Sequence, residues 1–295
     1  MILYLLEIKI VDQNNQQKKS NPLSQWFRQP KIFVKLPSQG DFYPQGSLDK
    51  SSTGEYPVYA MTAKDELMFK TPDALLSGQS TVEVIKSCIP AIQDPWQMPS
   101  LDIDAALIAI RVATYGENMG VEANCPHCGE ENDYDIDLVH WLDQINSWRF
   151  VPEVNFEPLT IFVRPYTYRE LSQTSLKTLE HQRIFNVINN EELSDEQKIE
   201  KFGQSFVKLT SLTIDIIAGC VSKISTPDGD VIDPAFIKEY IANAPKDVFE
   251  KISNHVTEMK QNIELPVQHV ACNSCSKEFD MPVTMDQSNF FGVGS

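Results

Sequence analysis

The sequence has no long apolar run, few cationic residues and no secretory leader pattern. No stretch approaches the roughly 20 apolar residues that a membrane-spanning helix needs. The opening segment Met1–Leu6 is apolar but short, and it lacks the basic start and the small-residue cleavage site of a signal peptide. We therefore expect a protein that is made in the cytoplasm and has no membrane among its partners.

The shortage of cations bears on nucleic acids as well. The 295 residues include 25 lysines and arginines against 41 acidic residues, which gives a formal net charge of −16. Because phosphate binding draws its affinity from clustered lysines and arginines, this balance argues against a surface for duplex nucleic acid. An acidic chain suits basic protein partners instead.

Catalytic signatures are scarce too. The 12 glycines fall singly at turns, so no glycine-rich phosphate loop precedes a helix. No serine occupies a glycine-flanked elbow, and the five histidines form no helical pair. The acidic pairs Asp102/Asp104 and Asp135/Asp137 are better explained as the first turn of a helix and as part of a strand. We predict that the protein is not an enzyme.

What the chain does have is a pair of Cys-x-x-Cys sequences that lie far apart. This spacing lets two thiolates and nearby backbone amides wrap one side of a tetrahedral metal ion, and two such pairs complete the tetrahedron. A closed four-thiolate site has no open position for water or substrate, so its role is structural. We predict one structural zinc ion per chain, held by Cys125, Cys128, Cys272 and Cys275.

Other interpretations of these cysteines stay open. The four thiols could form two disulfides or stay reduced, and His127 inside the first pair could replace a thiolate. The other two cysteines, Cys88 and Cys220, lie in apolar helical patterns and are expected to be buried small hydrophobic residues.

The segments around the two pairs resemble each other. An extended segment enters each pair, and an aromatic residue followed by aspartate leaves it, at Tyr134-Asp135 and at Phe279-Asp280. We interpret the two pairs as the two hairpins of one zinc ribbon. The 143 residues from Gly129 to Ala271 separate them, so the ribbon is interrupted by an inserted domain.

The pattern of apolar residues predicts an α+β fold that is mostly helical, with a small N-terminal sheet and a four-cysteine zinc ribbon interrupted by a helical insert. Strands are expected at 31–36 and 55–61, and the strongest helix at 100–115. The insert is expected to contain a hairpin at 154–163, helices at about 167–190, 194–221 and 246–263, and another helix from 234. The predicted domains are an N-terminal segment and linker (1–24), an N-terminal α+β region (25–118), the ribbon (119–137 plus 266–285), the insert (138–265) and a C-terminal tail (286–295).

Two segments are candidates for binding a partner protein. The C-terminal tail carries Phe290 and Phe291 next to flexible glycines. These rings either fold back on the chain's own ribbon or insert into a neighbouring subunit. The segment that begins with Trp26, Phe27 and Arg28 is basic and aromatic in an acidic chain, and the same two possibilities apply to it.

Five short motifs occur in order before the first cysteine pair: Phe27–Pro30, Leu36–Tyr43, Met61–Glu66, Thr71–Leu76 and Arg111–Gly116. Together they resemble the baseplate hub proteins of T-even-type bacteriophages, most strongly over residues 22–138. The resemblance implies a structural component of a contractile-tail baseplate, in the hub region, that contributes to tail and baseplate assembly. It also implies a protein made in the host bacterial cytoplasm and located in the virion, in a hetero-oligomeric assembly with other baseplate, hub and tail proteins.

Two other functions stay open. The protein could be an assembly factor or chaperone of the hub that is absent from the mature particle. It could also be a zinc-ribbon nucleic-acid-binding protein, although its net charge disfavours that function.

Overall fold

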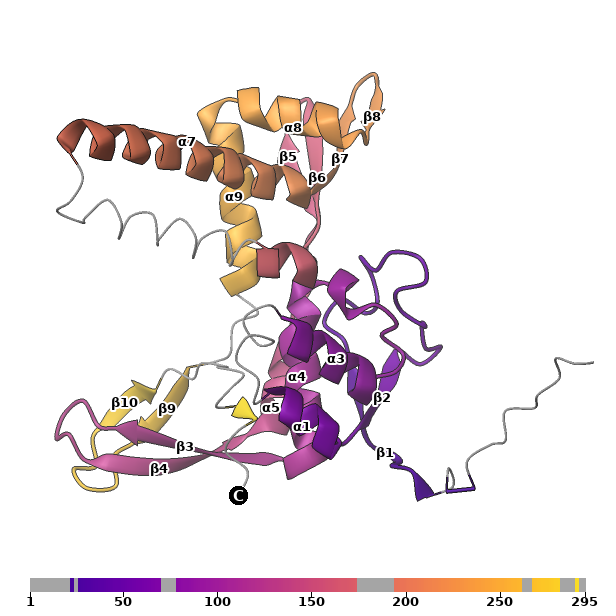
Figure 1. The fold of residues 1–295 in the computed structure, drawn as a ribbon, viewed down its shortest axis with the longest axis vertical. Helices are drawn as coiled ribbons and strands as arrows, with labels where there is room; N and C mark the ends of the chain where they lie inside the picture. The colour runs from indigo at the N-terminus through magenta and orange to yellow at the C-terminus, as the bar shows by residue number, and fades with distance from the viewer. Residues whose placement is uncertain are drawn as a thin grey trace, which may run out of the picture.

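A computed structural model describes residues 22–23, 26–69, 78–173, 194–261, 267–281 and 290–291. The fold is α+β: within these residues, ten strands form four small antiparallel sheets that pack with seven α-helices and one short 3-10 helix. The prediction of a mostly helical protein is therefore not confirmed. Figure 1 shows two bodies and a pair of hairpins that projects from one of them.

The first body is built around one buried helix, α4 (Ser100–Tyr115). Its apolar residues surround the axis, and Ala105 to Ile110 are completely inaccessible to solvent. The predicted N-terminal strands form a two-stranded sheet over this helix, with Phe33 opposite Pro57. The other elements of this body are β1 (Pro30–Lys35), β2 (Glu55–Tyr59), α1 (Ala63–Phe69), α3 (Gln79–Cys88), η2 (Pro95–Gln97) and α5 (Leu138–Ser147).

Helix α4 also buries a carboxyl group, which the sequence pattern did not predict. Asp102 accepts hydrogen bonds from the backbone N–H and the hydroxyl of Ser38, at 2.7 and 2.5 Å, and from the Tyr43 hydroxyl at 3.0 Å. Burial raises the pKa of Asp102 to about 7, although these three hydrogen bonds lower it. The carboxyl group thus fastens the loop after β1 to the central helix.

This carboxyl group predicts a pH dependence of stability. The folded pKa of Asp102 lies above its ordinary value of 3.8, so between these values the folded chain binds a proton that the unfolded chain has lost. Stability therefore falls as pH rises through this window. Asp102→Asn is neutral throughout and should lose that part of the slope. In urea unfolding at pH 5 and pH 8, the wild type should lose about 3 kcal/mol more than the variant, from 1.36 kcal/mol per pKa unit. Equal losses would contradict the prediction.

The second body lies in the insert and has a separate core. Its four antiparallel strands follow the order β5-β6-β7-β8, with residues such as Val154, Ile161 and Ile224 buried. Three helices pack with this sheet, and α7 is the longest of them (Figure 1). The elements are β5 (Glu153–Phe156), β6 (Leu159–Val163), α7 (Asp195–Cys220), β7 (Val221–Thr226), β8 (Gly229–Val231), α8 (Pro234–Asn243) and α9 (Lys246–Gln261).

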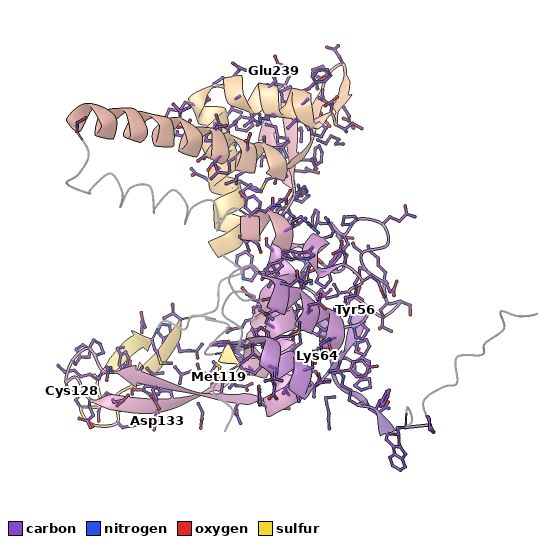
Figure 2. All side chains as sticks on the ribbon, in the orientation of Figure 1. Tyr56, Lys64, Met119, Cys128, Asp133 and Glu239 are labelled. Carbon is purple, nitrogen blue, oxygen red and sulfur yellow. The ribbon has the colours of Figure 1, made fainter. Side chains whose placement is uncertain are left out.

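Two hairpins complete the described chain. The first, β3 (Asn118–Asn124) with β4 (Glu131–Asp137), leaves α4 directly, and the second pairs β9 (Gln268–Ala271) with β10 (Glu278–Met281). Figure 2 shows Met119 at the base of the first hairpin and Cys128 at its far end. Met119 and Met281 are buried in the first core, which anchors both hairpins to that body.

No helix among the described residues is long and apolar enough to cross a membrane.

Candidate metal centre

The two cysteine pairs have the same backbone geometry, as their spacing predicted. In each loop the first cysteine donates its N–H to the carbonyl five residues on, at 2.9 Å for Cys125 and 3.0 Å for Cys272. The residue four positions after each cysteine, Gly129 or Ser276, donates back to that cysteine's carbonyl at 2.9 Å. Both of these residues have a positive φ, 77° and 57°, so each loop closes through a left-handed residue.

Each loop also directs a backbone N–H at its first sulfur. The amide of His127 donates to Cys125 Sγ, and that of Ser274 donates to Cys272 Sγ, both at 3.4 Å. Such N–H donors stabilise a thiolate, the form of cysteine that binds metals. The backbone amide of Cys275, followed by that of Ser274, lowers the pKa of the Cys272 thiol to about 6.

The fold brings all four predicted sulfur atoms together. They lie within 4.8 Å of one another, although the two pairs are separated by the whole insert. Cys125 Sγ is 3.8 Å from Cys275 Sγ, and Cys128 Sγ is 3.6 Å from Cys272 Sγ. A tetrahedral ion with metal–sulfur bonds of about 2.3 Å would separate its ligands by about 3.8 Å. The cluster therefore has dimensions that fit a metal ion.

These distances do not fit the disulfide alternative, since bonded sulfur atoms are about 2.05 Å apart, and all four thiols are free. The alternative in which His127 replaces a thiolate has no support either, because its Nε2 lies 3.4 Å from the Glu278 carbonyl oxygen. Cys88 and Cys220 are fully buried, as expected. Burial raises the pKa of the Cys220 thiol to about 12, which keeps it protonated.

The two hairpins also touch each other beside the sulfur atoms. The Tyr134 hydroxyl of β4 donates to the Ala271 carbonyl of β9 at 3.1 Å, and its ring meets Phe279 edge to face. The buried amide of Asn132 reaches the second cysteine loop. Asn132 could not be predicted from the sequence, because a single asparagine in a strand carries no recognisable signal.

The structure places the two C-terminal aromatic residues inside their own chain. Phe290 and Phe291 are 5% and 7% exposed in the first core, which also contains Met119 and Met281 of the two hairpins. Phe291 stacks on Phe69 with ring centroids 4.4 Å apart, and the Phe290 carbonyl accepts a hydrogen bond from the Arg111 guanidinium. This burial favours the alternative in which the two rings fold back on their own chain and close the fold, and partner binding through them stays a prediction.

The basic aromatic segment behaves differently. Trp26 and Phe27 are 78% and 57% exposed. Arg28 turns inward instead and donates to the Ser87 carbonyl at 2.6 Å, with Asp65 at 3.5 Å. Arg28 thus anchors this segment, and the two rings next to it stay available to solvent.

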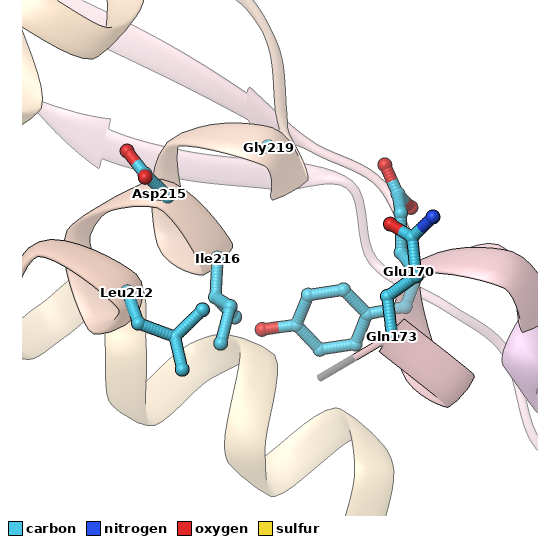
Figure 3. Close-up of a pocket in the computed structure, with 7 residues that line it drawn as sticks. Glu170, Gln173, Leu212, Asp215, Ile216 and Gly219 are labelled. Atoms are coloured by element: carbon cyan, nitrogen blue, oxygen red, sulfur yellow. The ribbon is translucent and has the colours of Figure 1, made fainter. Parts of the chain in front are cut away.

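A small pocket in the insert shows no catalytic arrangement. Its volume is about 130 Å³, below the range of roughly 300–1,000 Å³ for small-molecule sites. Glu170 is paired with Arg164 at 2.6 Å, and Asp215 with Lys238 at 2.7 Å, so neither carboxylate is free to act as a base. Burial raises the pKa of the remaining titratable group, the Tyr166 phenol. Figure 3 shows this lining, which consists of Tyr166, Glu170, Gln173, Leu212, Asp215, Ile216 and Gly219.

Fold and site together define an α+β protein with two separate cores and two distant cysteine pairs that meet in one cluster. The sequence profile of the T4 bacteriophage base plate protein matches residues 29–292, and the chain belongs to this family. The match confirms the resemblance found in the sequence and extends it across the insert. Membership implies interaction with other phage tail or baseplate proteins. A comparison with curated proteins gives no match, and neither does a comparison with solved structures.

Proposed function

We propose that this protein is a structural, non-catalytic component of the hub region of a contractile-tail baseplate, where it contributes to tail and baseplate assembly. The observation that carries the proposal is the family match over residues 29–292. The absence of a poised acid, base or nucleophile in the described pocket also supports a structural role. The protein is then located in the virion after synthesis in the host cytoplasm.

The cysteine cluster is assigned one structural zinc ion per chain, with Cys125, Cys128, Cys272 and Cys275 as its ligands. Four thiolates in a tetrahedral arrangement are a donor set typical of structural zinc, and the sulfur separations of 3.6 and 3.8 Å across the two loops support this assignment. Zinc would hold the projecting hairpins together at their cysteine loops, beyond the residues Met119, Ile136 and Met281 that the first core buries.

The domain division predicted from the sequence is retained as part of the proposal, with one refinement. Leu138 and Trp141 of α5 are completely buried, and α5 packs on α4 in the first core. This packing favours starting the insert after α5 instead of at residue 138.

We assign partner binding to Trp26 and Phe27, with Arg28 as the anchor of their segment. Their exposure supports this role, since aromatic residues are enriched at protein interfaces. The partners are other baseplate, hub and tail proteins in a hetero-oligomeric assembly. The net charge of −16 supports the absence of nucleic acid among them.

Mass spectrometry and elemental analysis test this proposal. The protein should be present in purified phage particles in a fixed low copy number, and the purified chain should carry about one zinc ion, as one closed site requires. An assembly factor would be found in assembly intermediates but not in mature particles, and that outcome would overturn the structural role. Salt-dependent binding to DNA or RNA would support the nucleic-acid alternative instead.

A further inference from the structure

Asn132 belongs to the first hairpin, but its side chain is bonded to the second cysteine loop. It lies in β4 next to Asp133, which Figure 2 labels on the hairpin near Cys128. It is only 4% exposed. Its Oδ1 accepts the backbone N–H of Asn273 at 2.9 Å, and its Nδ2 lies 3.6 Å from Cys272 Sγ. One buried side chain therefore joins segments that are about 140 residues apart.

The neighbours of this amide fix its orientation. The Glu130 carbonyl can only accept a hydrogen bond, and it lies 2.9 Å from Nδ2. The Asn273 N–H can only donate, so the atom that faces it must be the amide oxygen. The amide nitrogen therefore has one N–H bonded to Glu130 and a second directed at the sulfur. Cys272 Sγ also lies 3.7 Å from Oδ1, but Oδ1 already accepts the Asn273 N–H. A sulfur atom bound to a metal carries no proton, so in the proposed zinc site the Asn132 N–H is the donor toward Cys272 Sγ.

The Glu130 carbonyl ties the same side chain to the first cysteine loop. This carbonyl also accepts the backbone N–H of Cys125 at 2.9 Å. Asn132 thus contacts the first loop through Glu130, and the second loop through Asn273 and Cys272. Asn132 is thus a polar side chain of the first hairpin, outside the four cysteines, that reaches a sulfur atom of the second.

We propose that Asn132 is a positioning residue of the metal centre, an inference that rests on the proposed zinc site. It orients Cys272 Sγ with its N–H and holds the second loop against the first before the ion binds. Residues that hydrogen-bond to metal ligands fix their orientation and tune their charge. The cysteine ligands then already lie close to the positions they take around the ion, so less of the chain has to become ordered when the ion binds.

The first hairpin carries this amide, whereas the second has no polar side chain at the equivalent position, so the role of the amide can be tested by itself. Asn132 is the seventh residue after Cys125, and the seventh residue after Cys272 is Phe279. Phe279 packs against the Tyr134 ring and brings no polar group to the first loop. Tyr134→Phe is a matched control, because it removes a hydrogen bond between the same hairpins, the bond to the Ala271 carbonyl, without touching a sulfur atom.

The test measures Zn²⁺ and Co²⁺ affinity of the full chain by chelator competition. Asn132→Ala should lower both affinities by roughly 10–100-fold, the usual effect of losing a residue that supports a metal ligand. Asn132→Asp should lower them further, because it directs a carboxylate oxygen at a thiolate. The sulfur-to-cobalt charge-transfer band should shift in both variants. Tyr134→Phe should leave the band in place and change affinity less than Asn132→Ala.

Different outcomes reject different claims. A wild-type chain that binds neither ion rejects the zinc site, and this inference with it. A wild type that binds one ion, with Asn132→Ala binding it equally tightly, rejects the positioning role alone. A measurement on the wild type covers the case of a variant that does not fold: in the ¹¹³Cd-substituted chain, the Asn132 side-chain N–H should show scalar coupling to cadmium through Cys272 Sγ. Absence of this coupling would also reject the positioning role.

Discussion

Replacing Cys272 by serine is expected to abolish tight zinc binding and to unfold the two projecting hairpins. One lost thiolate leaves three ligands, and structural zinc sites contribute apparent binding free energies on the order of 10–16 kcal/mol. The first core buries Met119, Ile136 and Met281 of the hairpins, and Cys128 lies at the far end of the first hairpin from Met119 (Figure 2). The ends that carry the cysteine loops therefore have little else to replace the contribution of zinc. Elemental analysis should find less than one zinc ion per chain, and thermal unfolding should begin at a much lower temperature.

Ser274→Ala is the matched control for this prediction. Ser274 lies in the same loop with an exposed side chain, and its backbone N–H, which contacts Cys272 Sγ, is kept in the variant. Its zinc content and unfolding temperature should equal those of the wild type. Treating the wild type with a strong chelator should reproduce the behaviour of Cys272→Ser. The zinc assignment fails if Cys272→Ser retains both full metal content and wild-type stability.

Phe291→Ala is expected to destabilise the chain by about 3–5 kcal/mol, the usual cost of truncating a buried phenylalanine. The ring is 7% exposed and stacks on Phe69, so its removal leaves a cavity between the C-terminal segment and α1. The free energy of unfolding in urea measures this effect. A protein whose C-terminal aromatic residues served only to bind a neighbour would lose no stability as an isolated chain.

Phe33→Ala makes the same chemical change at an exposed position. Phe33 lies on β1 of the same body with 64% of its side chain accessible. The variant should stay within about 0.5 kcal/mol of the wild type, as surface substitutions usually do. Equal losses in the two variants would contradict the burial of Phe291 in the first core.

The sequence predicted the cysteine cluster because its signal is local. A Cys-x-x-Cys turn has one preferred geometry. Each pair supplies two ligands, so two pairs complete the set of four that a tetrahedral ion needs. The buried helix at 100–115 was predicted for a similar reason, since apolar residues recur around its whole surface. The convergence of the four sulfur atoms is confirmed, while the identity of the metal stays a prediction.

Other features depend on contacts that no local pattern shows. The strand β7 follows Cys220 directly and joins the hairpin β5–β6 into a four-stranded sheet, a pairing between segments far apart in the sequence, such as Phe162 with Lys223, that no local pattern shows. In the sequence, Asp102 looks like an ordinary acidic residue in the first turn of a helix. Its burial is evident only from the hydrogen bonds that Ser38 and Tyr43, which are distant in sequence, donate to it. The role of Asn132 depends on its contact with the second cysteine loop, which is distant in sequence.

The two halves of the cysteine cluster are made at different times. The 143 residues from Gly129 to Ala271 are translated between them, which takes about 7–30 s at roughly 5–20 residues per second. During that interval Cys125 and Cys128 leave the ribosome without the two sulfur atoms that face them in the finished fold. A nascent chain that stops inside the insert can never close the cluster. The closed cluster thus distinguishes a chain translated past Cys275 from a product that ends before it.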